Sequence, residues 1–380
     1  MASNPSTHLG ELFKSSRKKG EAGLPLLSVT LNNGLIVRDQ LDRRTETNLE
    51  ASEHLLVQSG DIAYNMMRVW QGALGRASVN GLVSPAYVVL RPTAKIDSLY
   101  AEYLFKTPRM IYLFWAYSYG LTKDRLRLYF NDFARIPVTI PNIKEQRKIA
   151  QILSTWDKAI TTTEQLLANN QQQKKALMQQ LLTGKKRLLD KNGVRFSGEW
   201  KRVELGDLLD YQQPTPYLVE STEYSDDFST PVLTAGKTFI LGYTDEESGI
   251  FSEQLPAIIF DDFTTDSKFV DFPFKAKSSA MKILTAKEGV SIKYVYEAMQ
   301  LLDFSVGGHQ RHWISIYSRL VIPFPDSEEQ QKIAVVLSTA DQEISALQQK
   351  LDALKQEKKA LMQQLLTGKR RVKIDDKEVA

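Results

Sequence analysis

The stretch NIKEQRKIAQILSTWD, residues 142–157, returns near the C-terminus as DSEEQQKIAVVLSTAD, residues 326–341. Further along, KKALMQQLLTGKKR at residues 174–187 returns as KKALMQQLLTGKRR at residues 358–371. Every matched pair is separated by the same shift of 184, the distance from Glu145 to Glu329, and no insertion interrupts the match. A gap-free duplication of this length dictates the architecture of the chain.

Both copies of the duplicated stretch have the pattern of a long helix. Asn142 precedes Glu145 by three residues, which is the capping-box spacing of a helix start, and Gly184 lies where a helix end needs a left-handed residue. Between these signals, mostly apolar residues follow alternating steps of four and three, as in the seam of a coiled coil. The seam includes Ile149, Leu153, Trp156, Ile160, Leu167, Leu177 and Leu181, and in the second copy Ile333, Leu337, Ile344, Leu351, Leu361 and Leu365. We expect helices at residues 142–184 and 326–368, each roughly 60 Å long at ~1.5 Å per residue.

Composition bounds the class of protein. With 380 residues, 42% of them hydrophobic and 25% charged, the chain is long enough for two or three packed domains. It has no cysteine and four histidines, so a disulfide framework and a thiolate metal site are excluded and little is left for zinc. No leader-like N-terminus and no run of about 18 apolar residues occurs, so we expect a cytoplasmic protein. A formal charge of +4 and a pI near 8.9 permit nucleic-acid binding without demonstrating it.

Two globular blocks precede the two helices. Residues 1–141 contain short apolar runs typical of strands, at 26–31, 35–37 and 87–90, and a capped helical pattern at 97–105, so we expect an α+β domain. Residues 199–325 form a second block that looks like a diverged copy of the first. LGEL at residues 9–12 matches LGDL at 205–208 with a shift of 196, and Ile62 matches Ile258 with the same shift. Residues 185–198 are the linker and residues 369–380 a charged tail.

The order of parts is block, helix, block, helix. Each helix is apolar on one stripe only, so a second helix that returns to cover this stripe must run antiparallel to the first. We therefore expect an α+β protein with two similar domains, separated by an antiparallel two-helix coiled-coil spacer and related by a pseudo-twofold axis. Such a spacer would act as a ruler. Adding seven residues after Thr163 and after Leu347 would lengthen it by ~10 Å, which is about three base pairs of DNA.

These features resemble the specificity subunit of Type I restriction-modification systems. The motif Pro-x-x-x-Glu-Gln-x-Lys-Ile-Ala-x-x-Leu-Ser-x-x-Asp starts each helix, at residues 141–157 and 325–341. One such motif is suggestive, whereas two in tandem behind two variable blocks are specific. The resemblance covers essentially the whole chain.

The resemblance implies a division of labour. Residues 1–141 and 199–325 would be target recognition domains, each reading one half of a split, asymmetric sequence in double-stranded DNA. The helices would dock two methyltransferase (M) subunits, in a complex with two restriction or translocase (R) subunits. The chain itself would be non-catalytic, would carry no cofactor or metal and would not touch a membrane. The methyl donor, ATP and Mg²⁺ would belong to the partner subunits.

DNA contacts are expected from loops that differ between the blocks. Arginine pairs with guanine and glutamine with adenine at base edges, while lysine mostly meets phosphate. For each of these side chains taken singly, a solvated surface charge is the favoured interpretation. Taken as a group, in glycine-flanked loops of both blocks, they fit DNA contacts equally well. The candidates are Arg68, Gln71, Lys123, Arg125 and Arg127 in the first block, and Lys268, His309, Gln310, Arg311 and His312 in the second.

Partner contacts are expected from the helices. Residues 174–182 recur letter for letter at 358–366, although a two-helix seam would constrain only its apolar positions. We therefore expect exposed, near-identical docking surfaces on both copies. The candidates are Glu145, Gln146, Lys148, Asp157, Lys174 and Lys175, with Glu329, Gln330, Lys332, Asp341, Lys358 and Lys359.

Alternative functions remain open from the residues alone. Asp261, Asp262, Asp266 and Lys268 could bind a metal and cut a phosphodiester, although residues 65–70 of the first block offer no carboxylate in the corresponding place. A nuclease or methylase component would show activity by itself. A stand-alone bivalent DNA-binding scaffold would bind DNA without methyltransferase partners.

Overall fold

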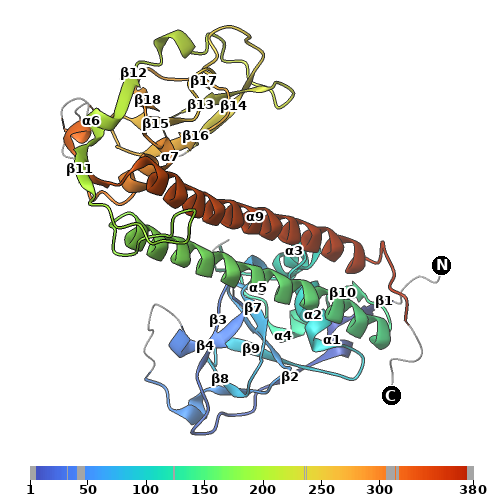
Figure 1. The fold of residues 1–380 in the computed structure, drawn as a ribbon. Coiled ribbons are helices and arrows are strands. Elements are labelled where there is room, and N and C mark those ends of the chain that lie inside the picture. The colour runs from blue at the N-terminus through green and yellow to red at the C-terminus, as the bar shows by residue number, and fades with distance from the viewer. Residues whose placement is uncertain are drawn as a thin grey trace. The chain divides into compact units, whose positions relative to one another are not determined.

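The computed structural model describes residues 6–31, 33–40, 48–122, 125–234, 236, 238–304, 313 and 316–374. The chain divides into two compact units, one of residues 1–163 with 350–380 and the other of residues 164–349. Each unit therefore holds one α+β block, the start of the helix that follows this block and the end of the other helix (Figure 1).

The first unit is built on an antiparallel sheet of four strands. Its order is β2 (Phe13–Ser16), β9 (Tyr87–Pro92), β6 (Ile62–Asn65) and β7 (Leu74–Arg76). Three strand pairs accompany it: β1 (Ser6–His8) with β10 (Pro137–Thr139), β3 (Leu27–Val29) with β4 (Leu35–Val37), and β5 (Leu55–Val57) with β8 (Gly81–Val83). The α-helices of this block are α1 (Leu9–Leu12), α2 (Ser98–Phe105), α3 (Pro108–Ala116) and α4 (Phe130–Phe133), and the 3-10 turns are η1 (Arg38–Gln40), η2 (Ala51–Glu53) and η3 (Val69–Gln71).

Local sequence explains where α2 and α3 begin. The carboxylate of Asp97 accepts a hydrogen bond of 2.8 Å from the backbone N–H of Tyr100, and Pro108 occupies the first turn of α3, where its missing N–H costs nothing. Behind these helices, Phe105 packs edge-on against Phe114 and Phe133, with ring centroids 5.4 and 5.9 Å apart. This aromatic core fixes α2 and α3 against the sheet.

The second unit repeats the sheet of the first. Its order is β12 (Leu209–Gln212), β18 (Met281–Ala286), β15 (Ala257–Asp261) and β16 (Ser267–Val270), and β11 (Lys201–Glu204) pairs with β19 (Val321–Phe324). Ile258 lies opposite Leu284, as Ile62 lies opposite Leu90 in the first unit. The two blocks thus share one fold, as expected. This block also contains β13 (Thr230–Leu233) with β14 (Ile240–Thr244) and β17 (Lys275–Ala276), the helices α6 (Leu205–Leu208) and α7 (Ile292–Met299), and the 3-10 turns η5 (Thr215–Tyr217) and η6 (Tyr317–Arg319).

Two helices of 39 residues, α5 (Ile143–Leu181) and α9 (Ser327–Leu365), follow the blocks. In the first unit Leu153, near the start of α5, shares a buried core with Leu365, at the end of α9. In the second unit Leu181, at the end of α5, shares a core with Leu337, near the start of α9. The predicted antiparallel pairing of the helices is therefore confirmed within each unit. Across the described residues, neither these helices nor the shorter ones are long and apolar enough to cross a membrane.

Candidate nucleic-acid interface

Two loops of the first unit that are far apart in sequence lie against each other. The backbone N–H of Leu128 donates a 3.0 Å hydrogen bond to the carbonyl of Met66, and the Tyr64 hydroxyl donates to the carbonyl of Leu128 at 3.2 Å. Tyr119 and Arg127 exchange two backbone hydrogen bonds of 3.2 and 3.0 Å, which closes a hairpin. The loop after β6 and the hairpin at residues 119–127 are thereby joined.

Four of the DNA-contact candidates lie on these joined segments. Arg68 and Gln71 are exposed in and beside η3, and Arg125 and Arg127 are exposed on the hairpin. Gly72 ends η3 with a left-handed φ of 96°, which a glycine adopts without strain, and so closes the turn that carries Arg68 and Gln71. The structure thus brings together guanidinium and amide side chains that the sequence patterns indicated separately. Lys123 lies outside the described residues.

In the second unit, the candidate Lys268 is exposed on β16. His309, Gln310, Arg311 and His312 lie outside the described residues. The residue that follows them, Trp313, is buried and its backbone N–H donates to the Asp262 carboxylate at 2.9 Å. Asp262 directly follows β15, so Trp313 is anchored beside the turn that leads to Lys268.

Two of the three carboxylates that could serve a nuclease, Asp261 and Asp262, have structural partners. Oδ1 of Asp261 accepts a 2.8 Å hydrogen bond from the backbone N–H of Phe263, which shapes the turn. Asp262 is 1% exposed and lies 3.4 Å from the ammonium of Lys282, which is itself buried. Among the residues that the structure describes, no group of three acidic or histidine side chains could hold a metal ion. The local geometry therefore favours a turn held by an ion pair.

Each repeated helix start carries a buried glutamate that is paired with an arginine. In the second unit, Arg187 donates from Nε and Nη2 to the two carboxylate oxygens of Glu329, each at 2.6 Å. In the first unit, Arg371 donates to Glu145 through the same two nitrogens. The indole N–H of Trp200 also donates to Glu329 at 2.9 Å. Bidentate pairs of this kind combine charge with fixed geometry.

A second reciprocal pair joins the interiors of the helices. Lys174 donates to Asp341 at 2.6 Å, and Lys358 donates to Asp157 on the other copy. Burial by itself would raise the pKa of Asp341, but the hydrogen bonds from Lys174 and Lys293 outweigh it and lower this pKa. Burial would likewise lower the pKa of Lys293, yet its hydrogen bonds to Asp341 and Glu297 raise it.

The surroundings of these Lys–Asp pairs differ between the units. In the second unit, the buried Glu297 of α7 lies 3.1 Å from Lys174 and 2.8 Å from Lys293. In the first unit, Tyr103 of α2 donates its hydroxyl to Asp157. Sequence patterns did not indicate Arg187, Arg371, Tyr103, Lys293 or Glu297 as site residues. The only signal was that Arg187 and Arg371 end the repeat.

The glutamines of the motif tie each helix to its own block. Gln146 accepts from the backbone N–H of Asp97 at 2.9 Å and donates to the carbonyl of Pro141 at 2.9 Å. Gln330 does the same with Ser291 and Pro325, at 3.0 and 2.8 Å. Asp97 and Ser291 are the cap residues of α2 and α7, so one side chain couples two helix starts.

The expectation of exposed docking side chains is wrong for four of the helix candidates. Glu145, Gln146, Glu329 and Gln330 are at most 2% exposed, because each is used within the chain. Asp157, Lys174, Asp341 and Lys358 also have partners within the chain, which accounts for their repetition. Lys148 and Lys332 are partly buried, whereas Lys175 and Lys359 are exposed.

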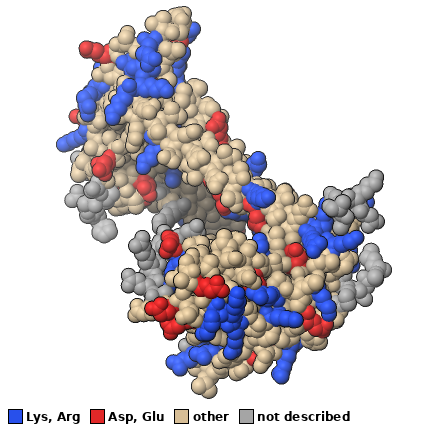
Figure 2. Space-filling view, turned by 90° about the horizontal axis from the view of Figure 1, so that it is seen from below, with Lys and Arg blue, Asp and Glu red and all other residues tan. Residues whose placement is uncertain are grey.

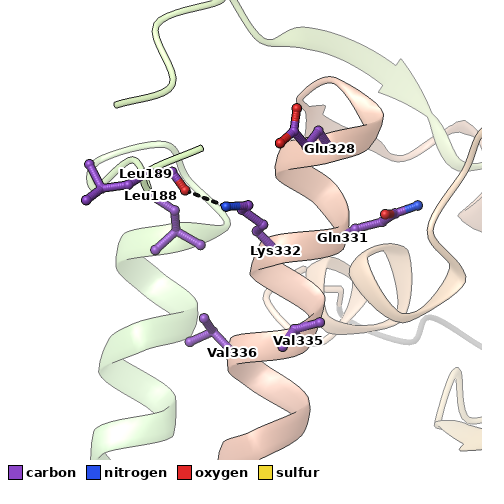
Figure 3. A pocket seen from close by; sticks show the side chains of 7 residues that line it. All are labelled: Leu188, Leu189, Glu328, Gln331, Lys332, Val335 and Val336. Carbon is purple, nitrogen blue, oxygen red and sulfur yellow. Dashed lines mark hydrogen bonds between the residues drawn. The ribbon is translucent and has the colours of Figure 1, made fainter. Parts of the chain in front are cut away.

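An open groove of about 550 Å³ lies beside the start of α9. Figure 3 shows Leu188 and Val336 on its wall, with Lys332 donating to the carbonyl of Leu189 at 2.9 Å. Val335 is 65% exposed at its edge. With the shift of 184, Val335 corresponds to Gln151. The two helix starts therefore share the arginine pairs of their buried glutamates, but they differ in the exposed side chain at positions 151 and 335.

Basic side chains are prominent on the molecule's surface. On the face seen in Figure 2, Lys and Arg side chains gather in groups in which few acidic side chains are interspersed. Such groups are suited to a phosphate backbone.

Comparisons with known proteins agree with this geometry. The family model of the Type I restriction modification DNA specificity domain matches residues 7–171 and 197–356. A Type I restriction enzyme specificity subunit from Escherichia coli is 49% identical over 158 residues, which are 40% of this chain and 38% of that protein. The chain thus spans well under half of that relative's length.

Two solved structures resemble the chain in fold. The crystal structure of a Type-I restriction-modification system S subunit from M. genitalium has a TM-score of 0.65 at 15% identity, covering 98% of this chain and 96% of the other. A chain from a type I R-M system structure has a TM-score of 0.50 at 14% identity, covering 96% and 98%. With two matched domains that together span most of its length, the chain belongs to the Type I restriction modification DNA specificity family.

Proposed function

We propose that this chain is the sequence-specific DNA-binding subunit of a Type I restriction-modification complex, in which each α+β block reads one half of a bipartite target. The observation that carries the proposal is the repetition of one sheet order in two blocks whose exposed loops differ. Arg68, Gln71, Arg125 and Arg127 are the base-reading candidates of the first block, and Lys268 is a phosphate or base contact of the second.

Catalysis belongs to partner subunits in this proposal. The carboxylates of Asp261 and Asp262 hold a turn and an ion pair, which supports a binding role for this loop. The methyl donor would bind to the methyltransferase subunits, and ATP and Mg²⁺ to the restriction subunits. The chain would contribute target selection and the surfaces on which those subunits assemble.

Two methyltransferase subunits would dock on the helices, one near each helix start. Exposed Lys175 and Lys359 lie near the helix ends, and each end shares a core with the start of the other helix. These two lysines recur on both copies and would contribute equivalent contacts. The groove at Leu188 and Val335 would receive an apolar side chain of the partner at the second copy only, since Gln151 replaces Val335 at the first. The two sites would therefore be related but unequal in affinity.

Mapping methylated adenines tests the function. Cells that carry the methyltransferase gene with this chain should show a bipartite, asymmetric methylated site, which cells lacking the chain should not show. The purified chain alone should neither cleave nor methylate DNA in the presence of Mg²⁺, ATP and the methyl donor. Turnover by the isolated chain, or an unchanged methylation pattern, would refute the proposal.

Native mass spectrometry tests the docking. The complex should contain two methyltransferase copies per chain. The substitution Val335→Lys alters a largely exposed side chain and should weaken the binding of one copy, so that this copy dissociates at a higher complex concentration than in the wild type. Gln151→Lys at the matched position should have a smaller effect. One copy per chain with both helices intact would count against two docking sites.

A further inference from the structure

Exposed apolar side chains are concentrated in one part of the first unit. Six of the nine large hydrophobic side chains exposed in the described part of this unit lie in or beside η3, α3 and the hairpin at residues 119–127: Met67, Tyr112, Trp115, Tyr119, Leu121 and Tyr129. Single exposed apolar residues are ordinary, but a contiguous group marks a binding surface. We call this group the aromatic patch.

Ring pairs hold the aromatic patch together. The rings of Tyr112 and Trp115 lie 5.8 Å apart, and those of Tyr119 and Tyr129 lie 5.7 Å apart. An open cavity of about 450 Å³ separates Trp115 from Leu121. Trp115, from the first ring pair, and Leu121 therefore line the same hollow.

Leu121 protrudes from this surface. Its side chain is 96% exposed, at the turn of the hairpin. Its neighbour Gly120 lies close to the returning strand of the hairpin, because a Cβ on Gly120 would clash with the carbonyl oxygen of Arg125. The hairpin thus presents an apolar side chain that is almost fully exposed to solvent.

The charge around the aromatic patch selects its ligand. Residues 107–129 contain four basic residues, Arg109, Lys123, Arg125 and Arg127, and one acidic residue, Asp124. The side chains of Arg109, Arg125 and Arg127 are exposed. A protein partner would meet an apolar surface with a net positive charge, whereas DNA supplies both phosphates for the arginines and flat apolar bases for the aromatic rings. Apolar wedges flanked by arginine are a known means of entering a base step and unstacking it.

We propose that Leu121 is a wedge that enters the base stack of the half-site read by the first block, with Trp115 on the facing wall of the hollow that receives the displaced base edge. The inference rests on the proposed DNA-binding function and adds to it a deformation of the target. In this inference, part of the preference for the target sequence comes from the energy of unstacking the base step that Leu121 enters, because this energy depends on the sequence. Hydrogen bonds at base edges supply the rest.

The experiment uses the full chain co-expressed with its methyltransferase subunit, and a duplex containing the methylated site found in cells. 2-Aminopurine, a fluorescent base that brightens when unstacked, replaces one base at a time through the first half-site. One step should brighten on binding of the wild-type complex. With Leu121→Ser this signal should disappear and affinity should fall about tenfold, whereas Val79→Ser, an exposed apolar side chain outside the aromatic patch, should change neither.

A second experiment uses a duplex that has a mismatched base pair at the step that Leu121 enters. The mismatch removes part of the unstacking cost, so it should bring the Leu121→Ser complex to within about threefold of the wild type. The wedge is refuted if no step brightens, or if Leu121→Ser loses the methyltransferase subunit and not the DNA, which would make the aromatic patch a protein-binding surface. Failure of the wild-type complex to prefer its target over unrelated DNA would instead refute the proposed function.

Discussion

Arg187 and Glu329 form a bidentate ion pair, and the pair Arg371 and Glu145 is its exchanged copy. Arg371 and Glu329 lie 184 residues after Arg187 and Glu145, so each copy of the repeat supplies an arginine to the other's glutamate. Lys174 with Asp341 and Lys358 with Asp157 follow the same rule. This reciprocity is the pairing pattern of a twofold-symmetric interface, here made within one chain.

The arginine substitution Arg187→Gln should destabilise the second unit. The side chain of Glu329 is fully buried, so removing its partner leaves an uncompensated charge, at a cost of about 3 kcal/mol in the free energy of unfolding. Urea unfolding measures this cost, and Lys186→Gln on the exposed neighbour is the control. Arg371→Gln should have a smaller effect, because Arg371 is 44% exposed. Equal losses of stability from both arginine substitutions would contradict this ranking.

A charge exchange should test the Lys–Asp pairing. Asp157→Lys and Lys358→Asp should each destabilise the first unit, because each places like charges together. The double variant should recover part of the stability, by about 1 kcal/mol, a modest value since the Asp157 side chain is 44% exposed. Strictly additive destabilisation in the double variant would show that the two side chains do not interact.

Asp341 should give the second unit an acid-sensitive step. Its folded-state pKa lies below the ordinary value near 4, so its contribution to stability is present above about pH 4 and is lost as the pH falls through the folded-state pKa. Asp341→Asn should flatten this part of the curve of unfolding free energy against pH between roughly 6 and 3. Glu343→Gln, an exposed neighbour on α9, should leave the curve unchanged.

The two blocks should read DNA independently. Arg125→Ala with Arg127→Ala should relax one half of the methylated site by ~1–3 kcal/mol for each base that is no longer read, and should leave the other half unchanged. Lys268→Ala should affect only the other half. Lys158→Ala on α5 removes an exposed charge outside the loops and serves as the control. Methylome sequencing gives the readout, and equal relaxation of both halves by either change would overturn the assignment.

Much of the fold could be predicted because its signals are local or repeated. The long helices and α2 follow from the sequence because their signals concern only neighbouring residues. These signals are the capping residue Asp97, the left-handed Gly184 and the alternating apolar seam that begins at Ile149. The joining of the loop that carries Arg68 to the hairpin that carries Arg125 could not be predicted in this way. It depends on a hydrogen bond between Leu128 and Met66, and no sequence pattern records that bond.

By itself the sequence determined the duplication, the two α+β blocks, the antiparallel helices and the family, because a shift of 184 without gaps leaves few ways to bury two apolar stripes. Only the tertiary structure decided what the repeated polar residues do. Glu145 has the pattern of an exposed helix-start residue, yet it is buried because Arg371, 226 residues away in sequence, reaches back to it. Local spacing cannot reveal such a partner, since the burial of a charge depends on which distant group neutralises it.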